Sequence, residues 1–354
     1  MTHVITHASG VSSRRDAAFD REMVASLRSD SLHLIILPTE QCNFRCTYCY
    51  EDFEIGRMGR STVEAIKRLI DRRMGDLRAL SISWFGGEPL LARNVVEDIS
   101  THISEAVSGR ELVSYVADMT TNGYLLDASA FEMLSGLGIR SYQVSLDGPS
   151  GVHDKTRRRA DGKGSFDRIW QNLVAIRDSR TEANVLLRVH LTPANIHDAP
   201  ELLVAIRDTF LADERFSVLL RPIERLGGPN DANMEILEGQ QRNSVIAELE
   251  SILHEGIDRT PLFDAPKVCY ASRPNSLMVR ADGRVGKCTV ALSDPANTIG
   301  RLMPDGSVKI DQELLKPWLR GWSSGDWEDI GCPYGGMPRR SSPPLLQIDR
   351  KPTD

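Results

Sequence analysis

The sequence predicts an α/β fold built on a parallel sheet. Over the first two thirds of the 354 residues, short runs rich in β-branched residues alternate with longer segments of helical spacing. Hydrophobic residues make up 41% and charged residues 26% of the chain, as in folded rather than disordered proteins. Such alternation implies parallel strands joined by right-handed crossovers, and it fits both an α/β barrel and an open doubly wound sheet.

Six candidate strands define the βα units. The first covers residues 32–38 (LHLIILP), and a helix is predicted at 62–74. A Gly, Pro and Asn stretch after Glu224 ends the pattern, and one more helix is predicted at 236–254. The other five strands are each separated from the next by one candidate helix, and they cover residues 80–85, 115–120, 141–146, 185–191 and 216–223.

The last third of the chain has a different character. From about residue 261 it is rich in Gly, Pro and turn signals, has little helical periodicity, and carries three of the six cysteines. These features predict a second, small, loop-rich domain. The expected organisation is an N-terminal extension at 1–30, a barrel-like part at 31–235, a linking helix at 236–260, the small domain at 261–340 and a tail at 341–354.

The charge and the cysteine count narrow the function. Forty-nine acidic against 43 basic residues give a net charge of −6, which disfavours nucleic acid as a partner. No apolar run approaches the roughly 18 residues of a membrane helix, and the N-terminus lacks the apolar stretch of a signal peptide, so we expect a cytoplasmic protein without a membrane partner. Six cysteines are too few for a disulfide scaffold, and in a reducing compartment clustered cysteines are more often ligands.

Three cysteines lie close together after the first strand. Cys42, Cys46 and Cys49 have the spacing CxxxCxxC within TEQCNFRCTYCYE. Three thiolates from one loop suit a four-iron cluster that keeps one iron open to a ligand, because cuboidal clusters normally take four cysteines. A zinc site needs a fourth ligand, and no His or Cys follows at zinc-finger spacing. Surface thiols placed by chance are the remaining alternative.

This loop closely resembles the hallmark of the radical S-adenosylmethionine (radical SAM) enzymes, CxxxCxΦC, whose aromatic position is Tyr48 here. The resemblance implies a partial (β/α)6 TIM-like barrel and a 4Fe-4S cluster whose open iron binds SAM. In that family an electron, supplied by a donor such as flavodoxin or ferredoxin, cleaves SAM to a 5′-deoxyadenosyl radical that abstracts a hydrogen atom. The cofactor carries the difficult chemistry, while the protein binds and orients.

Further motifs agree in their order along the chain. Residues 85–89 (FGGEP) follow the second strand and resemble the family's GGEP motif, although an ordinary strand-end turn has the same composition. Asn122 in TTNG and Ser145 in VSLDGP end the third and fourth strands, on the face where α/β barrels carry their sites. The resemblance implies that the residues binding SAM are Tyr48, Gly86, Gly87, Glu88, Pro89, Asn122, Ser145 and Arg157.

The segment 145–166 narrows the subfamily. It resembles the SLDGPxxxHDxxRxxxxGxGSF pattern of radical SAM enzymes that carry a C-terminal SPASM or twitch domain. Within that subfamily Ser145 would contact the SAM ribose and Arg157 the SAM carboxylate, which a guanidinium can pair in a fork. Arg158 and Arg159 have no such match; they fit a solvated basic loop, or a loop that holds an acidic peptide.

The other three cysteines, Cys269, Cys288 and Cys332, are spread along the last third of the chain. The first two form Cx13GxxxxC around Gly283, and Asp282-Gly283 is a hairpin signal, as in the opening half of a SPASM domain. Only Cys332 remains where that domain has a cysteine-dense run. The resemblance implies one auxiliary 4Fe-4S cluster in a reduced SPASM or twitch-like domain, and buried structural thiols are the alternative. His254 is a conceivable fourth ligand.

The resemblance implies a maturase that acts on a ribosomally made precursor peptide (a RiPP). We favour a side-chain crosslink, either a cyclophane or other C–C bond or a thioether, over epimerisation. The alternatives are an enzyme similar to the anaerobic sulfatase maturases, a small-molecule enzyme similar to the molybdenum-cofactor cyclase, and a non-catalytic iron–sulfur electron carrier. The GGEP and ribose-side motifs disfavour the carrier. The sequence identifies no catalytic acid or base.

Overall fold

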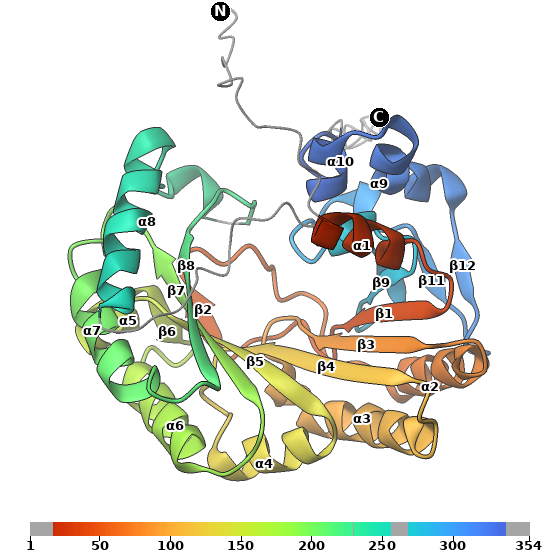
Figure 1. The fold of residues 1–354 in the computed structure, drawn as a ribbon, viewed down its shortest axis with the longest axis horizontal. Coiled ribbons are helices and arrows are strands. Elements are labelled where there is room, and N and C mark those ends of the chain that lie inside the picture. The colour runs from red at the N-terminus through yellow and green to blue at the C-terminus, as the bar shows by residue number, and fades with distance from the viewer. Residues whose placement is uncertain (1–16, 229, 256–267, 338–354) are drawn as a thin grey trace, which may run out of the picture.

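The computed structural model describes residues 17–228, 230–255 and 268–337, and it contains a ten-stranded sheet in the order β12-β11-β10-β9-β1-β3-β4-β5-β7-β8. All pairings from β1 to β8 are parallel, which confirms the predicted α/β class. Figure 1 shows these strands as an open arc, the partial barrel. The six strands are β1 (Ser31–Ile36), β3 (Ala79–Trp84), β4 (Ser114–Thr121), β5 (Ile139–Leu146), β7 (Asn184–Leu191) and β8 (Phe216–Pro222).

Helices cover the outer side of the arc (Figure 1). Their apolar residues recur at helical spacing: α2 buries Val63, Ile66 and Ile70 against the sheet. The last one starts three residues later than predicted, because Glu238 is its N-cap. These helices are α2 (Arg60–Met74), α3 (Arg93–Val107), α4 (Ala128–Gly136), α6 (Phe166–Asp178), α7 (Ala199–Phe210) and α8 (Gly239–His254).

The strands have two different faces, as β7 illustrates. Val185, Leu187 and Val189 are fully buried, whereas Leu186 and Arg188, which alternate with them, are less buried. Successive side chains of a strand point to opposite faces, so the fully buried set packs under the helices and the other set faces the inside of the arc. The inner face is therefore where a ligand meets polar side chains.

The chain after residue 268 extends the same sheet. Strand β9 (Ser276–Val279) pairs in parallel with β1, so that His33 is opposite Ser276. Antiparallel strands β10 (Arg284–Gly286), β11 (Gly300–Leu302) and β12 (Val308–Ile310) follow, and then helices α9 (Gln312–Ser324) and α10 (Trp327–Gly331). The division into domains at 261–340 and its neighbours stays a prediction, and the tail at 341–354 lies outside the described residues.

Two helices and two short strands in the first half of the chain were not predicted. Helix α1 (Ala17–Ser26) lies within the expected N-terminal extension, and helix α5 (Ser150–Thr156) follows β5. In addition, β2 (Phe44–Cys46) and β6 (Arg157–Arg159) form a separate two-stranded antiparallel sheet. Strands of three residues carry no alternation that a sequence pattern can reveal. None of the helices in the described part of the chain has the length and apolar character needed to cross a membrane.

Candidate functional site

The first cysteine set lies in the loop after β1. Cys46 ends β2, and all three thiols are partly buried. Burial raises the pKa of the Cys42 thiol, and Glu88, Cys46 and Cys49 raise it further. Burial, with Glu51 and Cys46, raises the pKa of the Cys49 thiol to about 12. The backbone N–H of Phe44 donates to Cys42 Sγ at 3.3 Å. The three thiols are thus close enough to interact, and they need a cation to become thiolates.

These residues fit a four-iron cluster better than a single zinc ion. Within the described ranges, no three His, Cys, Asp or Glu side chains gather tightly enough to hold one metal ion. In a four-iron cluster each cysteine binds a different iron, so the sulfurs lie farther apart than around a single metal ion, and all of them are thiolates. Burial raises the pKa of Cys46, and the charge of Arg157 opposes this by favouring the thiolate.

The GGEP turn packs directly on the cysteine loop. A Cβ on Gly86, whose φ is 111°, would collide with the carbonyl oxygen of Thr39, and one on Gly87 with that of Gln41. Glu88 N–H donates to the same Gln41 carbonyl at 3.0 Å. The two glycines are therefore required for the close approach of two backbones. Contact of this turn with SAM stays a prediction.

Glu88 positions the next motif along the sheet edge. It is fully buried, and its carboxylate accepts hydrogen bonds from Leu90 N (3.0 Å), Thr121 Oγ1 (2.8 Å) and Asn122 N (2.7 Å). Asn122 in turn donates from Nδ2 to Asn43 Oδ1 at 2.7 Å, with Cys42 Sγ 3.8 Å away. Pro89 begins a 3-10 turn behind Glu88. The GGEP and TTNG motifs are thus joined to the cysteine loop.

A buried network surrounds Tyr48. Its hydroxyl donates to Asp147, at 2.8 Å from Oδ2, and accepts from Arg157 Nη1 at 2.7 Å. Asp147 also accepts from Thr156 Oγ1 at 2.7 Å and lies 3.2 Å from His190 Nδ1. Burial alone would raise the pKa of Asp147, but the bond to His190 and the charge of Arg157 hold it well below its usual range.

Only part of the Arg157 guanidinium is hydrogen-bonded within this network. Its side chain is buried, and its Nε has no hydrogen-bond partner among the residues that the structure describes. Ser145, also buried, lies level with Arg188 in the register of β5 and β7. Sequence reasoning missed Asp147 and His190. Asp147 stands inside the SLDGP motif, which was a usable signal, whereas His190 had none.

The fold also gathers the second cysteine set. Burial raises the pKa of Cys269, and its neighbours Cys288 and Cys332 raise it further. Cys269 N–H donates to the Ile330 carbonyl at 3.1 Å, which ties this segment to the helix that precedes Cys332. Val290 N–H lies 3.4 Å from Cys288 Sγ. Three neighbouring thiols fit the ligand set of an iron–sulfur cluster.

The hairpin predicted at Asp282-Gly283 is present, because Gly283 has φ 83° between the antiparallel strands β9 and β10. Cys288 is further fixed by Asn297, which accepts from its N–H at 2.9 Å and donates to its carbonyl at 2.7 Å. The side chain of His254 lies outside the described residues, so its proposed role as a ligand stays a prediction.

Tyr50 lies between the two cysteine sets, and Glu51 follows it in the chain. After burial, the groups that raise the pKa of Tyr50 include Glu51, Cys49 and Cys288. Glu51 is 8% exposed, and its Oε2 has no partner within the described ranges. Burial and the nearby Glu40 raise the pKa of Glu51 to about 8. Neither residue was predicted, although both stand directly after Cys49.

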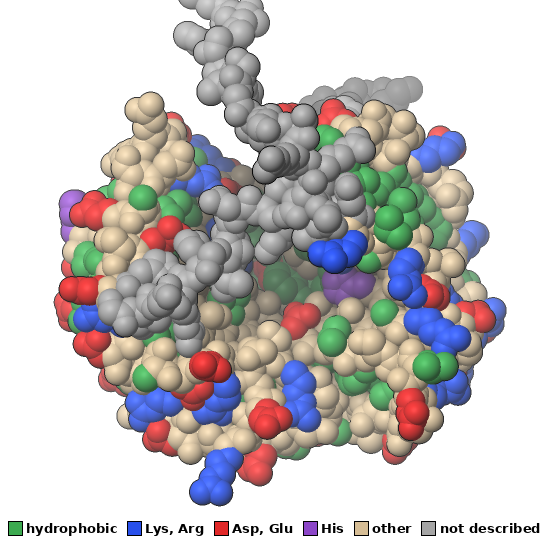
Figure 2. Space-filling model, in the orientation of Figure 1, with side chains coloured by type: hydrophobic (Ala, Val, Ile, Leu, Met, Phe, Trp, Pro, Cys, Tyr) green, Lys and Arg blue, Asp and Glu red, His purple; other side chains and the backbone are tan. Residues whose placement is uncertain are grey.

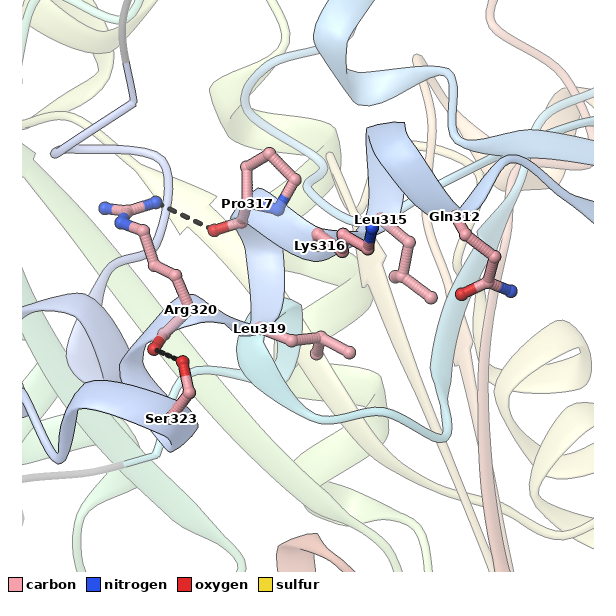
Figure 3. A pocket seen from close by; sticks show the side chains of 7 residues that line it. All are labelled: Gln312, Leu315, Lys316, Pro317, Leu319, Arg320 and Ser323. Atoms are coloured by element: carbon pink, nitrogen blue, oxygen red, sulfur yellow. Dashed lines mark hydrogen bonds between the residues drawn. The ribbon is translucent and has the colours of Figure 1, made fainter.

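A shallow pocket on α9 is separate from these groups. It has a volume of about 530 Å3, and Leu315, Pro317 and Leu319 contribute its apolar part. Figure 3 shows Arg320 Nη1 donating to the Pro317 carbonyl, at 2.9 Å. None of the residues predicted to bind SAM or iron lines this pocket.

Comparison with known proteins agrees with the geometry. Residues 36–205 match the Radical SAM superfamily model. A GTP 3′,8-cyclase of Microcystis aeruginosa is 29% identical over 279 residues, covering 72% of this chain and 80% of that protein. A cysteine-type anaerobic sulfatase-maturating enzyme of Clostridium novyi is 27% identical over 175 residues, 45% of this chain and 44% of that enzyme. The chain thus spans less than half the length of the Clostridium enzyme.

Two solved structures are similar in fold. One is anSMEcpe with bound AdoMet and the Cp18Cys peptide, with a TM-score of 0.62 at 18% identity over 85% of this chain and 88% of that one. The other is SuiB of Streptococcus suis bound to its precursor peptide SuiA, with a TM-score of 0.52 at 16% identity over 85% and 67%. At such identities the likeness shows the fold alone. Residues 36–205 of the chain are thus a radical SAM domain, on a fold shared with these two structures.

Proposed function

We propose that this enzyme modifies a ribosomally made precursor peptide by radical hydrogen abstraction and forms a side-chain crosslink. The observation that carries the proposal is the gathering of Cys269, Cys288 and Cys332 beside Tyr50, which itself neighbours the first cysteine set. Similarity in fold to two proteins solved with bound peptides supports a peptide as substrate.

Cys42, Cys46 and Cys49 would hold a 4Fe-4S cluster. When SAM is bound to such a cluster, the pair supplies a carbon radical strong enough to remove hydrogen from an unactivated C–H bond. The chain's own residues prepare the place: Arg157 favours the Cys46 thiolate, and Asn122 holds Asn43 beside Cys42. Because these groups are fixed by buried hydrogen bonds, the loop needs little reorganisation on binding.

Cys269, Cys288 and Cys332 would hold one auxiliary 4Fe-4S cluster. A crosslink removes two hydrogens from the peptide. The radical would take one as a hydrogen atom, and the other would leave as a proton to solvent and an electron, for which an auxiliary cluster is a suitable acceptor. Tyr50 lies near thiols of both sets, Cys49 and Cys288. The electron that starts each turnover would come from flavodoxin or ferredoxin.

A small-molecule substrate is the second candidate, because GTP 3′,8-cyclases are among the relatives and one of them matches over 72% of this chain. A sulfatase-maturase-like activity is the third, on the weaker match to the Clostridium novyi enzyme. A pure electron carrier does not require the intact GGEP turn and the Tyr48 network.

The decisive experiment uses the full chain reconstituted with iron and sulfide without oxygen. It is incubated with SAM, a reductant and the peptide encoded by a short reading frame beside its gene. Mass spectrometry should show 5′-deoxyadenosine and a peptide lighter by two hydrogens. An unchanged peptide mass with altered stereochemistry would replace the crosslink by epimerisation. Turnover of GTP in place of any tested peptide would favour the small-molecule candidate.

A further inference from the structure

Arg188 is an arginine of the inner face for which the structure describes no partner. Its Nε is buried, and it forms no hydrogen bond or ion pair with any residue in the described part of the chain. It lies on β7 between the fully buried Leu187 and Val189, which point to the helices. The guanidinium therefore faces the inside of the arc.

The neighbours of Arg188 leave its charge uncompensated. Burial lowers the pKa of Arg188, and the next largest influence is the like charge of Arg221. Arg221 itself is paired with Glu224 at 2.9 Å, and Arg157 donates to Tyr48 at 2.7 Å. Even with a lowered pKa an arginine stays protonated at neutral pH. Among these three guanidinium groups, Arg188 alone lacks a partner within the described ranges.

A charge without a partner in this position costs folding stability, because desolvation is not offset by an ion pair. Such a cost is tolerated where a ligand supplies the opposite charge. Arg188 lies level with Ser145 and is electrostatically coupled to Tyr48 and Tyr50, on either side of Cys49. Figure 2 shows that the molecule is hollowed on the face where the arc opens.

We propose that Arg188 is the receptor for a carboxylate of a ligand bound inside the barrel. A planar guanidinium with free donors matches a carboxylate in a two-point fork. This inference rests on the proposed function. Under that function the carboxylate belongs either to SAM or to an acidic residue of the peptide. Arg157, which the motif assigns to SAM, already donates to Tyr48, whereas no donor of Arg188 has a partner among the residues that the structure describes.

The first test uses the protein without SAM. Arg188→Met should raise the Tm, because it removes a partly buried charge for which the structure describes no counter-charge. Arg215→Met is the matched control, since Arg215 pairs with Asp213 and also donates to the Thr181 carbonyl, and it should lower the Tm. A fall in Tm for Arg188→Met like that of the control would overturn the proposal, because it would show a structural partner.

The second test identifies the carboxylate by calorimetry and thermal shift on reconstituted protein. If SAM is the ligand, Arg188→Met should weaken SAM binding by about ten- to hundredfold, Arg188→Lys less, and decarboxylated SAM should bind wild type and variant alike. If the substrate supplies the group, SAM affinity should stay unchanged, while N-acetylglutamate α-amide should raise the Tm of wild type but not of the variant. The matching glutamine amide should do neither.

If neither SAM nor the glutamate probe distinguishes Arg188→Met from wild type, Arg188 binds no carboxylate and the proposal fails. These readouts need no turnover. A failure to modify any peptide would therefore count against the proposed function without deciding the role of Arg188. Likewise, a failure of the Arg188 tests would leave the proposed function standing.

Discussion

Cys46 and Arg157 are a register pair in the short antiparallel ladder formed by β2 and β6. Through this ladder, the loop that follows the first barrel strand and the loop that follows the fourth become one structural unit. The same unit includes the hydrogen bond from Arg157 to Tyr48, which joins residues 109 positions apart. We therefore expect a substitution of Arg157 to alter the positions of the cysteines in this loop.

Replacing Cys46 by Ala should abolish reductive cleavage of SAM, because two thiolates cannot hold the predicted cluster. The measurement is 5′-deoxyadenosine formation after anaerobic reconstitution. Cys332→Ala is the matched control, since this exposed cysteine belongs to the second set and its loss should leave SAM cleavage in place. Wild-type cleavage by Cys46→Ala would remove this residue from the site.

Arg157→Ala should destabilise the protein by about 3–5 kcal/mol, because it leaves the buried Asp147 carboxylate without the nearby positive charge. Chemical denaturation of the protein without iron measures this. Arg157→Lys should recover part of the loss. Arg158→Ala, at the exposed middle position of the same strand, is the control and should change the free energy of unfolding by less than about 1 kcal/mol. Equal stability of the Arg157→Ala variant and wild type would contradict the network.

The stability of the protein should fall as the pH drops below neutrality. Burial, followed by the charges of Arg273 and Lys287, lowers the pKa of His33 to about 4. The unfolded chain then binds a proton near pH 6.5 that the folded chain refuses until about pH 4, so the free energy of unfolding decreases across that window, by up to about 3 kcal/mol.

His33→Gln tests this source, because an amide can still reach Ser83 and Ser276, the present partners at 3.0 and 2.9 Å. The free energy of unfolding, measured at several pH values between 4 and 7, should depend less steeply on pH in the variant than in wild type. An equal pH dependence of the free energy of unfolding in His33→Gln and wild type would show that His33 does not cause the loss of stability at low pH.

Changing Cys269, Cys288 and Cys332 together to Ala should reduce the bound iron from about eight to about four atoms per chain, at four per cuboidal cluster. SAM cleavage should survive, whereas peptide modification should stop. The small region should also loosen, because metal-binding free energy is folding free energy where no preformed site exists. Equal iron contents in wild type and variant would make these residues ordinary core thiols.

The order of strands and helices could be predicted because each βα unit carries a local pattern. The meeting of the cysteine loop, Glu88 and Asn122 followed from one rule, that carboxyl ends of parallel strands share an edge. The β2–β6 ladder was out of reach, since three-residue strands have no period. That Arg188 and the Oε2 of Glu51 have no partner among the described residues is a property of their surroundings, which single residues do not encode.

The pairing of β9 with β1 has a consequence for biosynthesis. His33 and Ser276 are hydrogen-bonded although 243 residues separate them, so the outer edge of β1 stays bare until most of the chain has left the ribosome. Contacts of such long range form slowly. An unpaired edge next to the cysteine loop is a template for wrong strand pairing, and we expect chains that end before residue 268 to aggregate rather than to take up iron.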